Sequence, residues 1–204
     1  MARQAVCISH STGAGGDAVG RAVAERLGFR YVDHEVIAEA AEWADLDPAF
    51  VADAERRKPF VARLLGPIVD QASSVRFPTP EPARGLPADA DLRLLIGDVL
   101  RSFADEGSVV IVAHAASFAL AGRDVLRVFV TASAETRAKR VAAARDIDER
   151  GAARVIKEED AARADYLKRF YAIDRELPTH YDIVINTDVL TPETAAELVV
   201  LPAS

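Results

Sequence analysis

The stretch Ser9-His10-Ser11-Thr12-Gly13-Ala14-Gly15-Gly16-Asp17-Ala18-Val19-Gly20 decides the fold of this chain. An apolar run precedes it, and apolar residues at helical spacing follow it. Residues 5–9 therefore predict a buried strand, and residues 15–27 predict a helix that ends at Gly28. Glycines let backbone N–H groups converge on an anion, and a helix N-terminus adds its partial positive charge. The stretch predicts a phosphate-binding turn between a strand and a helix.

The glycine-rich turn has the outline of a Walker A motif, G-x-x-x-x-G-K-[ST], without its lysine. Gly15 is followed by Gly16 and then by Asp17. The same residues also satisfy the dinucleotide motif G-x-G-x-x-G/A, with Asp33 at a plausible distance beyond it. That second motif is weak by itself. The helical and cationic segments further along fit a kinase with a lid better than a dehydrogenase.

Composition sets limits on the class of protein. The 204 residues suit one domain, and 50% hydrophobic with 28% charged residues is ordinary for a globular chain. A formal charge of −7 argues against nucleic-acid binding, because a polyphosphate backbone needs a basic surface. Cys7 is the single cysteine, so no disulfide forms within the chain. No run approaches the roughly 18 apolar residues of a membrane span. We therefore expect a cytoplasmic protein with no membrane partner.

Strand patterns alternate with helical patterns along the whole chain. This alternation predicts a parallel α/β sheet covered on both faces. Residues 45–87 read as an insertion, and their second half is rich in proline and glycine. Further strands are predicted at 29–32, 109–112, 125–130 and 181–185, and two helices carry most of 134–173.

The opening segment resembles the cytidylate-kinase-like family, a branch of the nucleoside monophosphate kinases. Its usual start is I-S-R-x-x-G-S-G-G-R-x-I-G, followed by Y-x-D-R-E-I, and residues 8–20 and 31–36 match these patterns. Residues 128–141, 153–166 and 181–187 resemble its V-F-(I/V)…E-x-R-x-x-R-V, A-R-x-(L/I)-x-x-x-D-x-x-R-x-x-Y and Y-D-L-V-I-N-T segments. The resemblance implies one P-loop kinase-like domain over residues 1–204, a doubly wound parallel sheet of about five strands in the order 2-3-1-4-5. It also implies a substrate-side insertion near 45–87 and a lid near 145–165.

The resemblance implies a function as well. We expect transfer of the γ-phosphoryl group of ATP, with Mg²⁺, to a small acceptor such as a pyrimidine nucleoside monophosphate. Backbone N–H groups of residues 13–17 would hold the donor phosphates, and the hydroxyl of Ser11 or Thr12 would assist the metal or the phosphate. The predicted nucleotide-binding set is Ser11, Thr12, Gly13, Ala14, Gly15, Gly16 and Asp17.

Several expected basic residues are replaced in this chain. Positions 10 and 34, where the family carries a basic residue, are histidines in this chain, His10 and His34. The family's G-R-G-A pattern is replaced by Ala113-His114-Ala115-Ala116. If the implied strand order holds, all three histidines rim one crevice at the carboxyl edge of the sheet. Three interpretations stay open: a retuned site for a phosphorylated ligand, a lapsed site whose histidines cap or pack, and a zinc site with Asp33. We assign His10, Asp33, His34 and His114 to the acceptor and predict no resident metal.

The arginine-rich helices allow two interpretations. Spacing alone favours a solvated face braced by ion pairs, whereas the resemblance favours Arg137, Arg154 and Arg163 as cations that stabilise the transferring phosphoryl group. The replaced basic residues also favour an alternative function, a catalytically silent nucleotide- or phosphate-binding protein that acts as a sensor or interaction module. A homo-oligomer is compatible with the sequence.

Overall fold

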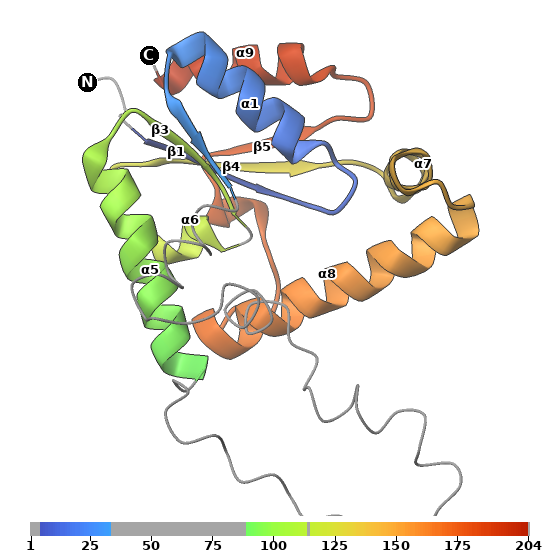
Figure 1. Cartoon of the computed structure of the whole chain (residues 1–204), viewed down its shortest axis with the longest axis horizontal. Helices are drawn as coiled ribbons and strands as arrows, with labels where there is room; N and C mark the ends of the chain where they lie inside the picture. The colour runs from blue at the N-terminus through green and yellow to red at the C-terminus, as the bar shows by residue number, and fades with distance from the viewer. Residues whose placement is uncertain (1–4, 34–88, 114, 204) are drawn as a thin grey trace, which may run out of the picture.

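A computed structural model describes residues 5–33, 89–113 and 115–203. Its centre is a parallel sheet with the strand order β2-β3-β1-β4-β5 (Figure 1). The order predicted from the resemblance, 2-3-1-4-5, is therefore confirmed. The strands are β1 (Ala5–His10), β2 (Arg30–Val32), β3 (Val109–Val112), β4 (Leu126–Thr131) and β5 (Ile183–Asn186).

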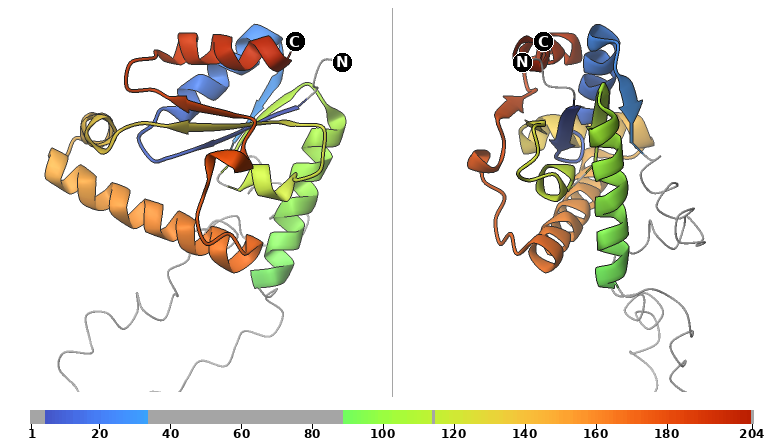
Figure 2. Two further views of the ribbon diagram at one scale, coloured as in Figure 1. Left: turned by 180° about the vertical axis from the view of Figure 1, so that it is seen from behind. Right: turned by 90° about the vertical axis from the view of Figure 1, so that its left-hand side faces the viewer.

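Helices cover both faces of the sheet. Figure 1 shows α1 (Gly16–Leu27) and α9 (Pro192–Ala203) on one face, and α5 (Asp89–Glu106) with α6 (Ala116–Ala119) on the other. Two further helices, α7 (Ala134–Arg145) and α8 (Glu149–Tyr171), follow β4, and α8 runs past the sheet on the side of α5 and α6 (Figures 1 and 2). A short 3₁₀ helix, η1 (Pro178–His180), leads into β5. Within the described ranges, no helix combines the length and the apolar character needed to cross a membrane.

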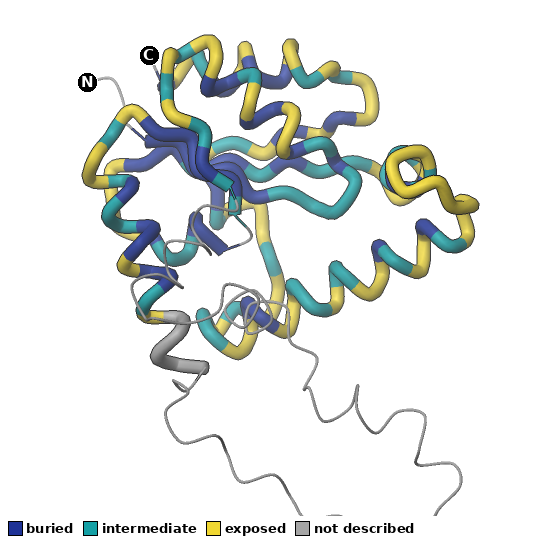
Figure 3. The backbone as a smooth tube through the Cα atoms, viewed as in Figure 1, coloured by how far each residue is buried: buried dark blue, intermediate teal, exposed yellow. Residues whose placement is uncertain are grey.

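The central strands are buried because helices press on both of their faces. All four residues of β3 are buried, as are the first five of β1, and these two central strands are dark blue in Figure 3. The core has two main parts, one under α5 and α6 and one under α1 and α9. Continuous apolar strands are what a parallel sheet with two covered faces requires.

Local signals set the helix ends. Helix α1 ends at Gly28, which has a φ of +66° and donates its N–H to carbonyls of the last turn, as the sequence predicts. Ser133 caps α7 and Asp148 caps α8, each through its side chain. The predicted lid, residues 145–165, comprises the end of α7, a three-residue connection and most of α8. Its role as a lid stays a prediction, and the predicted insertion at 45–87 lies outside the described residues.

We expect the thiol of Cys7 to be inert in the folded protein. Cys7 is fully buried in β1, and this burial raises its pKa to about 12. Because the thiolate is the reactive form, an aromatic disulfide reagent at pH 8 should modify the native protein slowly and the urea-unfolded protein at the rate of a free thiol. Fast modification of the native protein would contradict the buried position of β1.

Candidate functional site

The glycine-rich turn lies between β1 and α1 at the carboxyl edge of the sheet, beside α7 (Figure 1). Gly13 and Gly15 have φ values of +79° and +80°, which glycine adopts without steric cost. Gly15 is the N-cap of α1, and no side chain caps that helix start. The first N–H groups of a helix have no partner inside the helix, so they are available to an anion. The predicted glycine-rich turn between a strand and a helix is therefore present in the fold, and its binding of phosphate stays a prediction.

The turn is packed against α7 at Gly13. A Cβ atom added there would lie 2.8 Å from the carbonyl oxygen of Arg137 and 2.9 Å from a methyl carbon of Val141. Only glycine allows the backbones to approach this closely. Helix α7 therefore forms one wall of the turn.

Three arginines hold carbonyl oxygens of the turn and of the strand end that precedes it. Arg137 Nε donates to the Thr12 carbonyl at 2.6 Å, and Arg140 Nη1 donates to the Ala14 carbonyl at 3.2 Å. Arg163 Nη1 donates to the carbonyl of His10, the last residue of β1, at 3.2 Å. Cations thus bind the negative ends of the peptide dipoles. Within the turn the N–H of Ala14 donates to the Ser11 carbonyl at 2.9 Å, whereas the N–H groups of Gly13 and Gly15 have no acceptor among the described residues.

The predicted catalytic residues Arg137 and Arg163 each form an ion pair as well. Arg137 Nη2 contacts both carboxylate oxygens of Asp160, at 2.6 and 2.8 Å, and its side chain is 11% exposed. Arg163 donates from Nε and Nη2 to the carboxylate of Glu176, and its side chain is 9% exposed. These pairs hold both guanidinium groups beside the turn. Stabilisation of a transferring phosphoryl group by either residue stays a prediction.

Glu176 also connects to the sheet. The hydroxyl of Tyr181 donates to Glu176 Oε1. The pKa of the phenol is raised above its usual range, mainly because the group is buried and secondly because of this hydrogen bond. Arg163 lies over the ring of Phe129 on β4, 5.6 Å from its centroid. The carboxylate of Glu176, itself bound by Tyr181, and the ring of Phe129 therefore hold the Arg163 side chain in place.

The third predicted catalytic residue, Arg154, lies apart from this group. It is exposed on α8, nine residues before Arg163. At 100° and 1.5 Å per residue, this spacing places it about half a turn around the helix and roughly 14 Å along it. The structure therefore brings together Arg137 and Arg163 but not Arg154.

His10 packs on the start of α1. A Cβ atom added at Gly16 would lie 2.3 to 2.5 Å from three carbons of the His10 side chain, its Cβ and two atoms of the imidazole ring. The ring nitrogen Nε2 lies 3.6 Å from Asp17 Oδ1, and Nδ1 lies 3.2 Å from the Ser11 carbonyl oxygen. The imidazole thus fills the space in which a side chain at position 16 would begin, the position of the lysine in a Walker A motif.

The other predicted acceptor residues are described only in part. Asp33 directly follows β2 and accepts a hydrogen bond from Arg21 of α1 at 3.3 Å. His34 and His114 lie outside the described residues, so the predicted crevice of three histidines stays a prediction. Across residues 5–33, 89–113 and 115–203, no group of three histidine, cysteine or acidic side chains is arranged to hold a metal ion.

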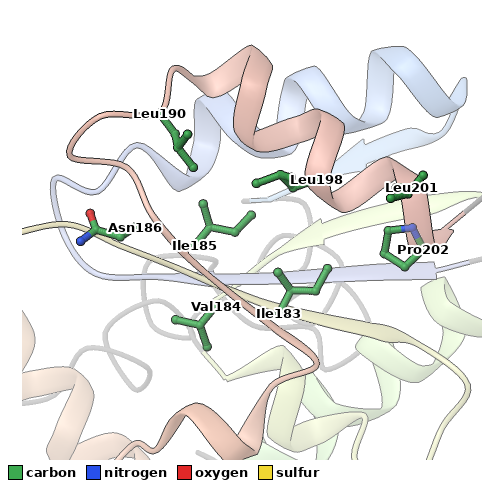
Figure 4. Close-up of a pocket in the computed structure, with 8 residues that line it drawn as sticks. All are labelled: Ile183, Val184, Ile185, Asn186, Leu190, Leu198, Leu201 and Pro202. Carbon is green, nitrogen blue, oxygen red and sulfur yellow. The ribbon is translucent and has the colours of Figure 1, made fainter.

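A small cavity opens beside the turn. Its volume is about 290 Å³, and its walls include Ser11, Asp160, Arg163 and Glu176. A larger groove of about 660 Å³ lies elsewhere, between the edge strand β5 and α9. Figure 4 shows Leu190, Ile185 and Leu198 facing one another across this groove. The larger groove is mainly apolar and does not include the turn, so the smaller cavity is the one that belongs to the site.

A model of the cytidylate kinase-like family matches residues 5–189. The chain belongs to this family. A cytidylate kinase from Sulfolobus acidocaldarius is 30% identical over 103 residues, which cover 50% of this chain and 56% of that protein. The chain thus matches little more than half the length of this curated relative.

Solved structures support the fold of this family member. An uncharacterized protein from Eubacterium ventriosum has a TM-score of 0.69 at 19% identity, with 98% of this chain and 97% of that chain covered. Shikimate kinase from Bacteroides thetaiotaomicron has a TM-score of 0.52 at 15% identity, with coverages of 96% and 95%. The sheet and helices are therefore those of a P-loop kinase fold.

The sequence predictions missed four residues of the site. Arg140 and Thr187 contact Ala14, and Glu176 with Tyr181 holds Arg163. Arg140 and Thr187 lie inside the segments that resemble the family, and this position was the one sequence signal that could have pointed to them. Their contacts join residues far apart in the chain, which spacing along one helix does not predict.

Proposed function

We propose that this protein transfers the γ-phosphoryl group of ATP to a small acceptor, a pyrimidine nucleoside monophosphate. The observation that carries the proposal is the turn itself. Its glycines adopt positive φ, its carbonyls are bound by arginines, and it leads into an uncapped helix N-terminus. Membership of the family and the partial similarity to a cytidylate kinase support the same chemistry.

The turn would bind the donor phosphates through its backbone. The N–H groups of Gly13 and of residues 15–17, with the positive end of the α1 dipole, would face the phosphate oxygens. The N–H of Ala14, also predicted to do so, donates instead to the Ser11 carbonyl at 2.9 Å. Mg²⁺ uses one or two protein oxygens together with phosphates and water, and the hydroxyl of Ser11 or Thr12 offers such an oxygen. When bound, Mg²⁺ would neutralise charge on the transferred group.

The acceptor would lie at the same carboxyl edge of the sheet. Asp33 follows β2, the neighbour of β3, and β3 pairs with β1. In open α/β sheets ligands bind at this edge. The cavity bordered by Ser11 and Arg163 provides room next to the turn, and Arg163 would present positive charge to an incoming phosphate. His10, His34 and His114 remain the proposed acceptor contacts with Asp33.

A silent nucleotide-binding protein is the second candidate, and the ion pairs favour it. Arg137 and Arg163 are both engaged by carboxylates, and Gly16 with Asp17 replaces the lysine and hydroxyl residue of a Walker A motif. In this alternative the turn binds a nucleotide but transfers nothing. Catalysis and binding therefore have to be measured separately.

The test combines calorimetry of ATP binding with a coupled assay for ADP release in the presence of Mg²⁺ and CMP, dCMP or other acceptors. We expect acceptor-dependent ADP release that falls about 100-fold or more in Arg163→Gln, because a cation beside the transferring group is lost. Arg169→Gln is the matched control, since Arg169 lies on the same helix and pairs with Asp165. If ATP binds but no acceptor gives turnover, the protein is the silent nucleotide binder. If the protein shows neither ATP binding nor turnover, both proposed functions are rejected.

A further inference from the structure

The carbonyl oxygen of Ala14 is held by two side chains from distant parts of the chain. Thr187 Oγ1 lies 2.7 Å from it, and Arg140 Nη1 lies 3.2 Å from it. Arg140 also donates to Thr187 Oγ1 at 2.9 Å and to the Thr187 carbonyl at 2.6 Å. The Thr187 residue is 3% exposed, directly after β5. Together these three residues form a closed arrangement that we call the Ala14 clamp.

The direction of each hydrogen bond in the Ala14 clamp is fixed by chemistry. A guanidinium group can only donate, so Thr187 Oγ1 accepts from Arg140 and keeps its own hydrogen for a carbonyl. The Ala14 carbonyl is the nearer acceptor, at 2.7 Å compared with 3.2 Å for the Thr131 carbonyl. The hydroxyl therefore transmits the orientation of Arg140 to the turn.

Holding this carbonyl also orients the next N–H group. In a planar trans peptide the C=O of Ala14 and the N–H of Gly15 point in opposite directions. The N–H of Gly15 therefore points away from Arg140 and Thr187. The contact between Arg137 and the Thr12 carbonyl orients the N–H of Gly13 in the same way. In the part of the chain that the structure describes, neither N–H has an acceptor.

The peptide between Ala14 and Gly15 needs such a restraint. Glycine adopts positive and negative φ with similar ease, so Gly15 offers little resistance to rotation of this peptide plane. A rotated plane would turn the negative carbonyl toward the anion and remove an N–H donor from it. We therefore expect a rotated peptide to weaken the binding of phosphate and to leave the packing of the core unchanged.

We propose that Arg140 and Thr187 are positioning residues that hold the Ala14–Gly15 peptide in its phosphate-binding orientation. Neither residue lines the cavity beside the turn, so they act through the peptide and not on the acceptor. The inference rests on the proposed function in one respect, namely that the anion bound by the turn is the polyphosphate of a nucleotide. Inorganic tripolyphosphate is therefore a sufficient probe.

The test compares variants that differ in the Ala14 clamp alone. Thr187→Val removes the hydroxyl with little change of shape, Thr187→Ser keeps it, and Arg140→Lys keeps the charge but not the forked geometry. Arg145→Lys is the control, because Arg145 lies on the same helix and pairs with Glu159 on α8. We expect tripolyphosphate and ATP to bind about tenfold more weakly to Thr187→Val and Arg140→Lys. Thr187→Ser and Arg145→Lys should bind as the unmodified protein does.

A second measurement separates positioning from stability. The ¹H–¹⁵N resonances of Gly13 and Gly15 report on the turn without any ligand, and Gly15 should shift or broaden in Thr187→Val while Gly13 changes little. If the variants lose melting temperature but keep ligand affinity and the Gly15 resonance, the clamp is only structural and the inference is overturned. If the unmodified protein binds neither probe, the proposed function fails, and the Gly15 resonance alone then decides whether the clamp exists.

Discussion

Replacing Gly13 with alanine is expected to lower the melting temperature by about 10 °C, corresponding to roughly 3 kcal/mol in a chain of this size. Two costs combine at this position. The φ of +79° is strained for alanine, and the new Cβ would lie 2.8 Å from the backbone oxygen of Arg137. The turn can relieve the contact only by moving away from α7, which would break the hydrogen bond from Arg137 to Thr12. ATP binding should therefore fall with stability, and differential scanning fluorimetry with calorimetry measures both.

Gly28→Ala separates the two costs. Gly28 has a φ of +66°, but a Cβ atom there would meet nothing within 4 Å. We expect a loss of about 1–2 kcal/mol from backbone strain alone, with ATP binding unchanged. Equal losses for Gly13→Ala and Gly28→Ala would show that the close approach to α7 contributes nothing.

The fold was predictable because its signals are local or follow the family pattern. Apolar runs marked the strands, Gly28 marked the end of α1, and alternation of strands with helices required parallel pairing. The strand order came from the resemblance and was confirmed. Alternation alone does not fix an order, since several arrangements of five parallel strands satisfy it.

The partners of the arginines were not predictable from spacing. Spacing along the helices predicted a solvated face braced by ion pairs without saying which helices they join, and Asp160 of α8 pairs with Arg137 of the preceding helix. Such a pair depends on how α7 and α8 pack, which no local pattern encodes. The ion pair and the contact with the turn belong to the same residue, since Arg137 binds Asp160 and the Thr12 carbonyl at once, and its role as a cation for the phosphoryl group stays a prediction.

The missing lysine of the Walker A motif can be examined through the pair formed by His10 and Gly16. Alanine in place of Gly16 should destabilise the protein by about 2 kcal/mol, because its Cβ would overlap the imidazole. In a His10→Gly background, which removes the Cβ of residue 10 as well as the ring, the sign should reverse. Position 16 is the first residue of α1, and alanine is better than glycine in a helix by about 0.5–1 kcal/mol. Chemical denaturation of the four proteins in this double-mutant cycle measures the coupling, and additive effects would contradict it.

The same pair predicts how nucleotide affinity can be raised. Lysine at position 16 has no room beside the imidazole, so Gly16→Lys alone should destabilise the protein and bind ATP poorly. With His10→Gly, which also removes the Cβ that lies 2.4 Å from a Cβ at position 16, the ammonium group gains access to the phosphates, and ATP affinity should rise about 10- to 100-fold over His10→Gly alone. Gly16→Met in that background matches the length of lysine without its charge and should give no gain. A gain with methionine would assign the effect to packing, whereas a gain limited to lysine would show that His10 occupies the place of the Walker A lysine.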